Sequence, residues 1–157
     1  MDWTKGFLAA GMMKAILLPF CKRIEIAGSI RREKEQVNDV ELVVIADGCR
    51  LEQFFINVHY HPLYIFKKFG PKWKQYYYEG VKYDVFITNE NHWGWIYLLR
   101  TGSQDFSKRV AIELKKAHYT MEEGRILDPF QKEVICKTEE EVFALINQDF
   151  ILPKNRL

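Results

Sequence analysis

Residues 27–42 read AGSIRREKEQVNDVEL, and this stretch decides the fold. It begins where an alternating segment, residues 23–27, predicts a strand that the Gly-Ser pair then ends. Asp39 and Glu41 open a second expected strand, residues 39–46, which is β-branched and apolar after its acidic start. Because side chains alternate along a strand, the two carboxylates share one face and the residues between them face a core.

Adjacent carboxylates repel each other and resist joint ionisation. A hard divalent cation removes this conflict, and Mg²⁺ commonly binds one or two carboxylates together with substrate phosphates. A third carboxylate, Asp84, lies on another expected strand, residues 81–88. Neighbouring strands would let Asp39, Glu41 and Asp84 converge and hold two cations about 3.5–4 Å apart, the arrangement used for in-line displacement at phosphorus.

The residues before the acidic pair suit a polyphosphate. Gly28 lets the backbone approach a ligand closely. Ser29 offers a hydroxyl and a backbone N–H at the start of a turn or helix, where anions bind. Arg32 can bind phosphate oxygens through its forked guanidinium. A lone Gly-Ser is usually a plain turn and a lone Asp-x-Glu a solvated strand face, so only the joint pattern carries this interpretation.

The composition bounds the possibilities. The chain has 157 residues, 48% hydrophobic and 28% charged, which is enough for a buried core. Three cysteines lack the spacing of a disulfide scaffold or a zinc site, which favours a reducing compartment. No apolar run is long enough to cross a membrane. We therefore expect an intracellular protein, cytoplasmic or associated with a nucleoid or virus, that is neither secreted nor bound to a membrane. The net charge of +2 is too small to identify a polyanionic partner.

Hydrophobic patterning predicts an α+β chain with a boundary near residue 89. The expected strands are residues 23–27, 39–46, 64–69, 73–78 and 81–88. The expected helices are residues 7–20, 50–59, 92–100, 104–118 and 138–148. A small hairpin is expected from residues 126–127 and 133–136.

Lysines and aromatic residues are interspersed over residues 66–83, a combination suited to phosphates and exposed bases. We expect Lys72, Lys74 and Lys82 to contact DNA. The alternative is an amphipathic hairpin whose lysine edge is solvated and discourages aggregation. The sequence leaves both interpretations open.

The sequence resembles the family X DNA polymerases, whose type member is polymerase beta, over about residues 24–156. Four stretches carry the resemblance: residues 28–41, residues 83–85, Thr101-Gly102-Ser103 with Phe106-Ser107-Lys108, and the tail from Thr138 to Arg156. The resemblance implies a minimal palm-plus-thumb form without a lyase domain. Residues 1–88 would be the nucleotidyltransferase palm, a mixed sheet with flanking helices. Residues 89–157 would be a smaller, helix-rich thumb subdomain that selects the nucleotide and carries a short hairpin.

The resemblance also implies the site. Asp39, Glu41 and Asp84 match metal-binding catalytic carboxylates, which implies two Mg²⁺ or Mn²⁺ ions. The family has a cis peptide where this chain has Gly102-Ser103. The residues that match nucleotide contacts are Gly28, Ser29, Arg32, Asn38, Leu99, Arg100, Gly102, Ser107 and Lys108.

The implied activity is that of a DNA-directed DNA polymerase. It would be a monomer that fills short gaps in repair or replication, with a primer-template or gapped duplex and a nucleoside triphosphate as partners. Two departures stand out: Glu41 replaces the usual aspartate, and Leu99-Arg100 replaces an aromatic or Gly-Trp pair, so sugar selection does not carry over. Two alternatives remain, a template-independent or small-target nucleotidyltransferase and a catalytically quiet nucleic-acid-binding module.

Overall fold

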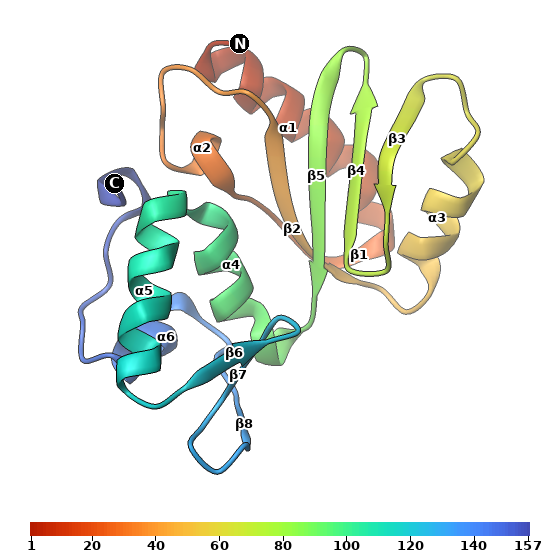
Figure 1. Ribbon diagram of the computed structural model, residues 1–157. Coiled ribbons are helices and arrows are strands. Elements are labelled where there is room, and N and C mark those ends of the chain that lie inside the picture. Colours follow the sequence, from red (N-terminus) through yellow and green to blue (C-terminus); the bar gives the residue numbers. More distant parts are fainter. The chain divides into compact units, whose positions relative to one another are not determined.

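A mixed sheet of five strands forms the first of two units into which the chain divides, Met1–Thr88 and Asn89–Leu157 (Figure 1). The structure is a computed structural model that describes residues 1–157. Strands β2 and β5 pair in parallel, and the other neighbours pair antiparallel. In sheet order, the strands are β1 (Cys21–Ile26), β2 (Val40–Ala46), β5 (Val81–Thr88), β4 (Trp73–Tyr78) and β3 (Tyr64–Phe69).

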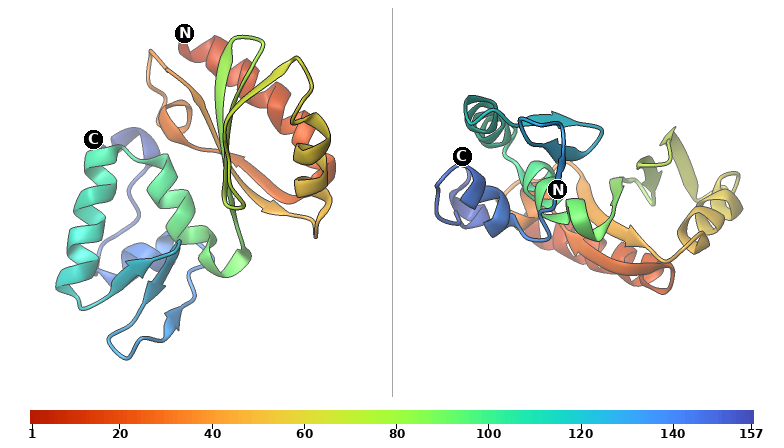
Figure 2. Two further views of the ribbon diagram at one scale, coloured as in Figure 1. Left: turned by 45° about the vertical axis from the view of Figure 1, so that its right-hand side comes forward. Right: turned by 90° about the horizontal axis from the view of Figure 1, so that it is seen from below.

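Helices α1 (Trp3–Leu17) and α3 (Arg50–Val58) pack against this sheet and share one hydrophobic core with it (Figure 2). Tyr83 lies in the core, where its hydroxyl donates to the Ala9 carbonyl at 3.3 Å and burial raises its pKa to about 12. The other fully buried members include Ala10, Met13, Leu17, Val40, Leu42, Val44, Leu51, Phe55, Tyr76 and Val85. Alternate residues of β2 and β5 therefore face the helices, and the residues between them face the opposite side.

The first helix begins earlier than the expected residue 7, because Asp2 caps it by accepting a hydrogen bond from the Lys5 backbone N–H at 2.9 Å. It gives way to the short 3₁₀ helix η1 (Leu18–Phe20) at Pro19, which has no N–H to continue an α-helix. The α-helix thus ends just before Pro19 because of the missing N–H. The hydrophobic pattern alone did not locate this end.

Three helices and a three-stranded antiparallel sheet form the second unit (Figure 1). The elements are η2 (Glu90–His92), α4 (Trp93–Thr101), α5 (Gln104–Lys116), β6 (Thr120–Glu122), β7 (Arg125–Leu127), β8 (Glu133–Val134), α6 (Glu139–Leu145) and η3 (Pro153–Asn155). The α+β class predicted from the sequence is confirmed. The expected hairpin is a three-stranded sheet, because β6 is too short to show an alternation of its own.

Helix α6 is held at both ends by local chemistry. The Thr138 hydroxyl accepts a hydrogen bond from the Glu141 N–H at 3.3 Å, as is usual for a threonine that precedes a helix with glutamate three residues later. The helix ends before the expected residue 148, because Asn147 adopts a left-handed conformation with φ of 53°. Against its N-terminus lies Gly94, where an added Cβ would come within 2.1 Å of the Thr138 carbonyl oxygen. Only glycine fits this approach of α4 to α6.

An internal salt bridge anchors the C-terminal tail. Arg156 is fully buried, and its Nη1 donates to Glu139 Oε2 at 2.6 Å while its Nε donates to the Ile151 carbonyl at 2.9 Å. The guanidinium carbon also lies 5.3–5.5 Å from the ring centroids of Phe106, Phe143 and Phe150. A charge so enclosed is stabilised by its partners, and so is the partner carboxylate.

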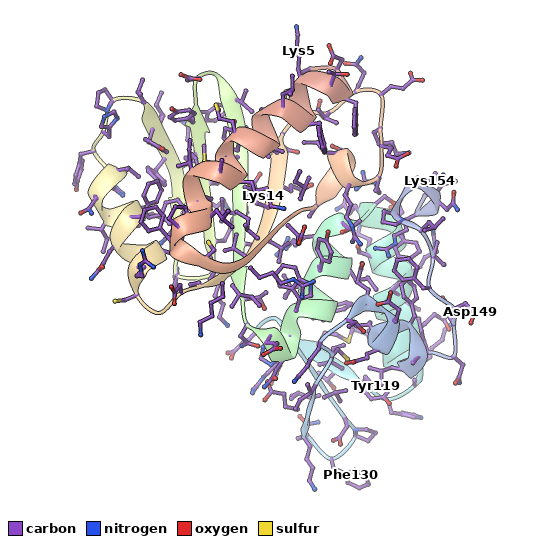
Figure 3. The ribbon with its side chains drawn as sticks, turned by 180° about the vertical axis from the view of Figure 1, so that it is seen from behind. Lys5, Lys14, Tyr119, Phe130, Asp149 and Lys154 are labelled. Atoms are coloured by element: carbon purple, nitrogen blue, oxygen red, sulfur yellow. The ribbon has the colours of Figure 1, made fainter.

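We expect Arg156→Met to lower the free energy of unfolding of the C-terminal unit by about 3–5 kcal/mol, because it leaves the buried Glu139 carboxylate without its counter-charge. Urea denaturation measures this loss. The matched control is Lys154→Met, which removes a positive charge from an exposed position on the same tail (Figure 3). Arg156→Met combined with Glu139→Gln should recover part of the loss. Equal stability of Arg156→Met and Lys154→Met would contradict the assignment.

Candidate metal and nucleotide site

The parallel pairing of β2 with β5 brings two of the three predicted carboxylates side by side. Glu41 and Asp84 are register partners across these strands. Both alternate with core residues, so they lie on the face of the sheet opposite α1 and α3. Asp39 directly precedes β2. The sequence-based prediction that the third carboxylate lies on a neighbouring strand is thus realised in the backbone pairing.

A lysine connects Asp39 and Asp84. Lys82 Nζ donates to Asp39 Oδ2 at 3.1 Å and lies 3.8 Å from Asp84 Oδ2. The hydrogen bond to Asp39 raises the pKa of Lys82 above its usual value. Desolvation opposes this shift, and the charges of Asp39 and Asp84 add smaller contributions that raise the pKa further. The side chain therefore stays an ammonium ion at neutral pH, and the two carboxylates share one positive charge.

Strand β4 holds the other oxygen of Asp84. Trp73 Nε1 and Gln75 Nε2 both donate to Asp84 Oδ1 at 2.8 Å. The indole of Trp73 is itself stacked on Phe86, with ring centroids 5.7 Å apart, and Lys68 Nζ lies 3.9 Å above it. Asp84 is only 5% exposed. Two neutral donors thus hold Oδ1 of the Asp84 carboxylate, and Oδ2 faces the Lys82 ammonium.

The Gly-Ser segment packs directly on Glu41. Gly28 begins the short helix α2 (Gly28–Arg31) with φ of +62°, and an added Cβ would lie 1.9 Å from Glu41 Oε2. The Ala27 N–H also donates to the Glu41 carbonyl at 2.8 Å. Burial lowers the pKa of Arg32, and the nearby Glu41 charge opposes that shift. Gly28 is therefore required for the position of the Glu41 carboxylate.

A polar cleft of about 590 Å³ opens over these residues. This volume is within the usual range for small-molecule sites. Its lining consists of Ser29, Arg32, Lys34, Glu35, Gln36, Asn38, Asp39 and Glu41. The cleft thus joins most of the residues predicted to contact phosphate with two of the predicted carboxylates, all within the N-terminal unit.

No group of three or more histidine, cysteine, aspartate or glutamate side chains in the chain is arranged to hold a metal ion. The donor types nevertheless fit Mg²⁺ or Mn²⁺, since Asp39, Glu41 and Asp84 supply only hard carboxylate oxygens. The Lys82 ammonium lies within ion-pair distance of two of them, at 3.1 Å from Asp39 Oδ2 and 3.8 Å from Asp84 Oδ2. These carboxylates are therefore chemically suited to divalent cations.

The three lysines predicted to contact DNA occupy different environments. Lys72 is exposed. Lys74 is fully buried, with its Nζ 2.8 Å from Glu52 Oε2 and 4.0 Å from the centroid of the Phe69 ring. The expectation for Lys74 is corrected accordingly: it stabilises the packing of α3 on β4 and presents no charge to the surface. Lys82 is directed at the carboxylates described above.

The comparison with protein families identifies the second unit. The family model described as DNA polymerase beta thumb matches residues 96–157. This part of the chain is similar to a DNA polymerase beta thumb, and the second unit is called the thumb after that similarity. The resemblance to family X DNA polymerases stated from the sequence is thus confirmed through the thumb. No protein with curated annotation matches the chain.

The thumb holds the remaining predicted nucleotide contacts. Leu99 and Arg100 are half-buried near the end of α4, and Lys108 is exposed on α5. Ser107 is 5% exposed and donates through its hydroxyl to the Leu99 carbonyl at 3.0 Å. The hydroxyl of Ser107 therefore joins the two helices, and its expected nucleotide contact stays a prediction.

The Thr-Gly-Ser element forms the junction between α4 and α5. Thr101 and Gly102 are buried, and the Gly102–Ser103 peptide bond is cis, as the resemblance implies. The Ser103 hydroxyl caps α5 by accepting a hydrogen bond from the Phe106 N–H at 3.2 Å. Gly102 and Ser103 thus set the turn between the two helices.

Sequence analysis missed the two residues of β4 that hold Asp84. One of them could have been found. The two-residue turn at Glu79-Gly80 pairs Tyr78 with Val81, and counting back along this hairpin pairs Gln75 with Asp84. Trp73 reaches Asp84 diagonally, by a side-chain orientation that register alone does not give.

We expect Gly28→Ala to lower the free energy of unfolding by about 1 kcal/mol more than Gly80→Ala does. Both positions have positive φ, but only the Cβ at residue 28 displaces Glu41, whereas nothing lies within 4 Å of the one at residue 80. Urea denaturation measures both variants. Adding Glu41→Ala to Gly28→Ala should remove the difference, and equal losses in the two single variants would disprove the contact.

Proposed function

We propose that the chain is a DNA polymerase-type nucleotidyltransferase that adds nucleotides to a primer 3′-hydroxyl, with short gaps in duplex DNA as its substrate. The observation that carries the proposal is the register pairing of Glu41 with Asp84 in a chain whose second unit is a polymerase beta thumb. The pairing supplies the carboxylate face that phosphoryl transfer needs, and the thumb match supports DNA as the substrate class.

In this proposal the carboxylates of Asp39, Glu41 and Asp84 hold two divalent cations, Mg²⁺ or Mn²⁺. When bound, such ions lower the pKa of the attacking hydroxyl and stabilise negative charge on the phosphates. Asp84 Oδ2 is suited to accept the proton of the primer hydroxyl, since Oδ1 already accepts the bonds from Trp73 and Gln75.

The triphosphate would occupy the cleft beside these carboxylates. Ser29 can donate its hydroxyl and backbone N–H to phosphate oxygens, and Arg32 adds a positive charge. Asn38 lies in the same lining and is an exposed residue. In the reaction the primer oxygen forms a bond to the α-phosphorus, and the bond from that phosphorus to the pyrophosphate oxygen breaks. Ser29 and Arg32 would steady the departing pyrophosphate.

The proposal assigns contacts with the incoming nucleotide to Leu99, Arg100, Gly102 and Lys108 of the thumb. These assignments rest on the resemblance of the Thr-Gly-Ser element to family X polymerases. Lys108 is exposed and can therefore approach a ligand, which supports its assignment as a nucleotide contact.

We expect Asp39→Asn and Asp84→Asn each to reduce primer extension by at least about 100-fold, because each removes a carboxylate that would hold the divalent cations, and those cations would stabilise the reacting phosphates by several kcal/mol. A gapped duplex, single deoxynucleotides and Mg²⁺ or Mn²⁺, resolved on a gel, measure the rate. The matched control is Asp47→Asn, which alters a partly exposed aspartate paired with Arg50.

Full activity of Asp39→Asn and Asp84→Asn would contradict the proposal. Primer extension whose rate does not depend on the template base would instead identify a template-independent nucleotidyltransferase. Binding of DNA without any extension would identify a catalytically quiet module.

DNA contact by the exposed lysines of β3 and the β3–β4 turn forms a separate prediction. Lys67 and Lys72 are exposed on this hairpin. We expect Lys67→Ala with Lys72→Ala to weaken DNA binding and to lower the slope of log K against log salt concentration by about 1–2, since each phosphate contact contributes about 0.9. Fluorescence anisotropy with a gapped duplex measures both quantities. Lys5→Ala, an exposed lysine on α1, should change neither (Figure 3). An unchanged slope would assign these lysines to a solvated sheet edge.

A further inference from the structure

The position of Lys82 carries an inference beyond the assignment of the carboxylates. We propose that the Lys82 ammonium is an internal stand-in for a divalent cation, which holds Asp39 and Asp84 together in the metal-free protein and moves aside when a cation binds. The inference deepens the proposed function, because it rests on the same carboxylates as cation ligands.

The contacts define one place for one cation. Lys82 Nζ lies 3.1 Å from Asp39 Oδ2 and 3.8 Å from Asp84 Oδ2. The two aspartate oxygens can therefore be no farther apart than the sum of these distances, although their residues are far apart in the sequence. A cation that binds both oxygens competes with the ammonium for the same acceptors.

The carboxylates need such a charge for a physical reason. Two carboxylates at this separation repel each other, and Asp84 is almost fully buried, where repulsion is less screened than in water. Lys82 is on the same strand as Asp84, two residues before it, so its side chain leaves from the same face of the sheet. A flexible lysine side chain can give up its place without a change in the backbone.

The contacts of Asp84 with β4 allow a cation to replace the Lys82 ammonium without moving the Asp84 carboxylate. Asp84 Oδ1 is bound by Trp73 and Gln75 of β4, both neutral donors at 2.8 Å. These bonds do not involve Oδ2, the oxygen that faces Lys82. When the ammonium leaves, Asp84 therefore keeps its orientation. Lys82 is accordingly a positioning residue, and Trp73 and Gln75 preserve the geometry through the exchange.

The first test measures binding of Mn²⁺ alone by isothermal calorimetry, with no nucleotide or DNA. Lys82→Met should bind Mn²⁺ about three- to tenfold more tightly than the unaltered chain, because the competing ion pair is gone. Its thermal midpoint in chelator should fall, and the rise on adding Mn²⁺ should be larger. Lys82→Arg, which keeps the charge, should bind no more tightly than the unaltered chain.

The matched control is Lys14→Met. Lys14 pairs with Glu25 at 3.5 Å on the same unit, and its side chain is 35% exposed against 31% for Lys82. Its replacement should leave the affinity for Mn²⁺ unchanged. Equal or weaker binding of Mn²⁺ by Lys82→Met than by Lys14→Met would overturn the proposal.

The second test follows the unaltered chain, so it does not depend on the folding of a variant. Amine labelling by trinitrobenzenesulfonate, read by mass spectrometry, should modify Lys82 several-fold faster in Mn²⁺ than in chelator, while Lys14 labels equally in both. An unchanged rate at Lys82 in saturating Mn²⁺ would overturn the displacement.

The two proposals fail separately. Faster labelling of Lys82 in Mn²⁺ together with an absence of primer extension would contradict only the polymerase function. Primer extension together with unchanged labelling and affinity would contradict only the role of Lys82.

Discussion

The structure depends on one constraint, which is that acidic side chains on two parallel strands must lie side by side without driving those strands apart. Glu41 and Asp84 are register partners in β2 and β5. Their repulsion is offset in two ways. Lys82 places a positive charge between Asp39 and Asp84, and Glu41 turns towards the segment that contains Gly28 and Arg32. Favourable packing on the other face of the sheet holds the strands together.

That packing explains why the acidic face can exist. The residues that alternate with Glu41 and Asp84 are fully buried against α1 and α3. Apolar burial of about 25 cal/mol per Å² favours this arrangement strongly enough to accommodate a local concentration of negative charge. Strand alternation thus separates the two faces of one sheet, with apolar packing on the helix-covered face and the carboxylates on the other.

The thumb uses buried charge differently. Arg156 is surrounded by the rings of Phe106, Phe143 and Phe150, and its pairing with Glu139 ties the tail to α6. Lys74 in the first unit follows the same pattern, with Glu52 and Phe69 as neighbours. In both places a cationic side chain fills a core position among aromatic rings, so the abundance of aromatic residues serves packing at these sites.

Much of the fold and part of the site followed from the sequence. The sequence by itself determined the five strands of the larger sheet and the expectation that Asp39 and Glu41 share a face, because alternation and turn chemistry are local. It also placed β3, β4 and β5 at their observed bounds. Only the tertiary structure decided which lysine is buried, which one lies between the carboxylates, and that Trp73 and Gln75 hold Asp84. Those contacts depend on how side chains from different strands and helices are oriented in three dimensions. Residue type and spacing along the chain do not determine that orientation.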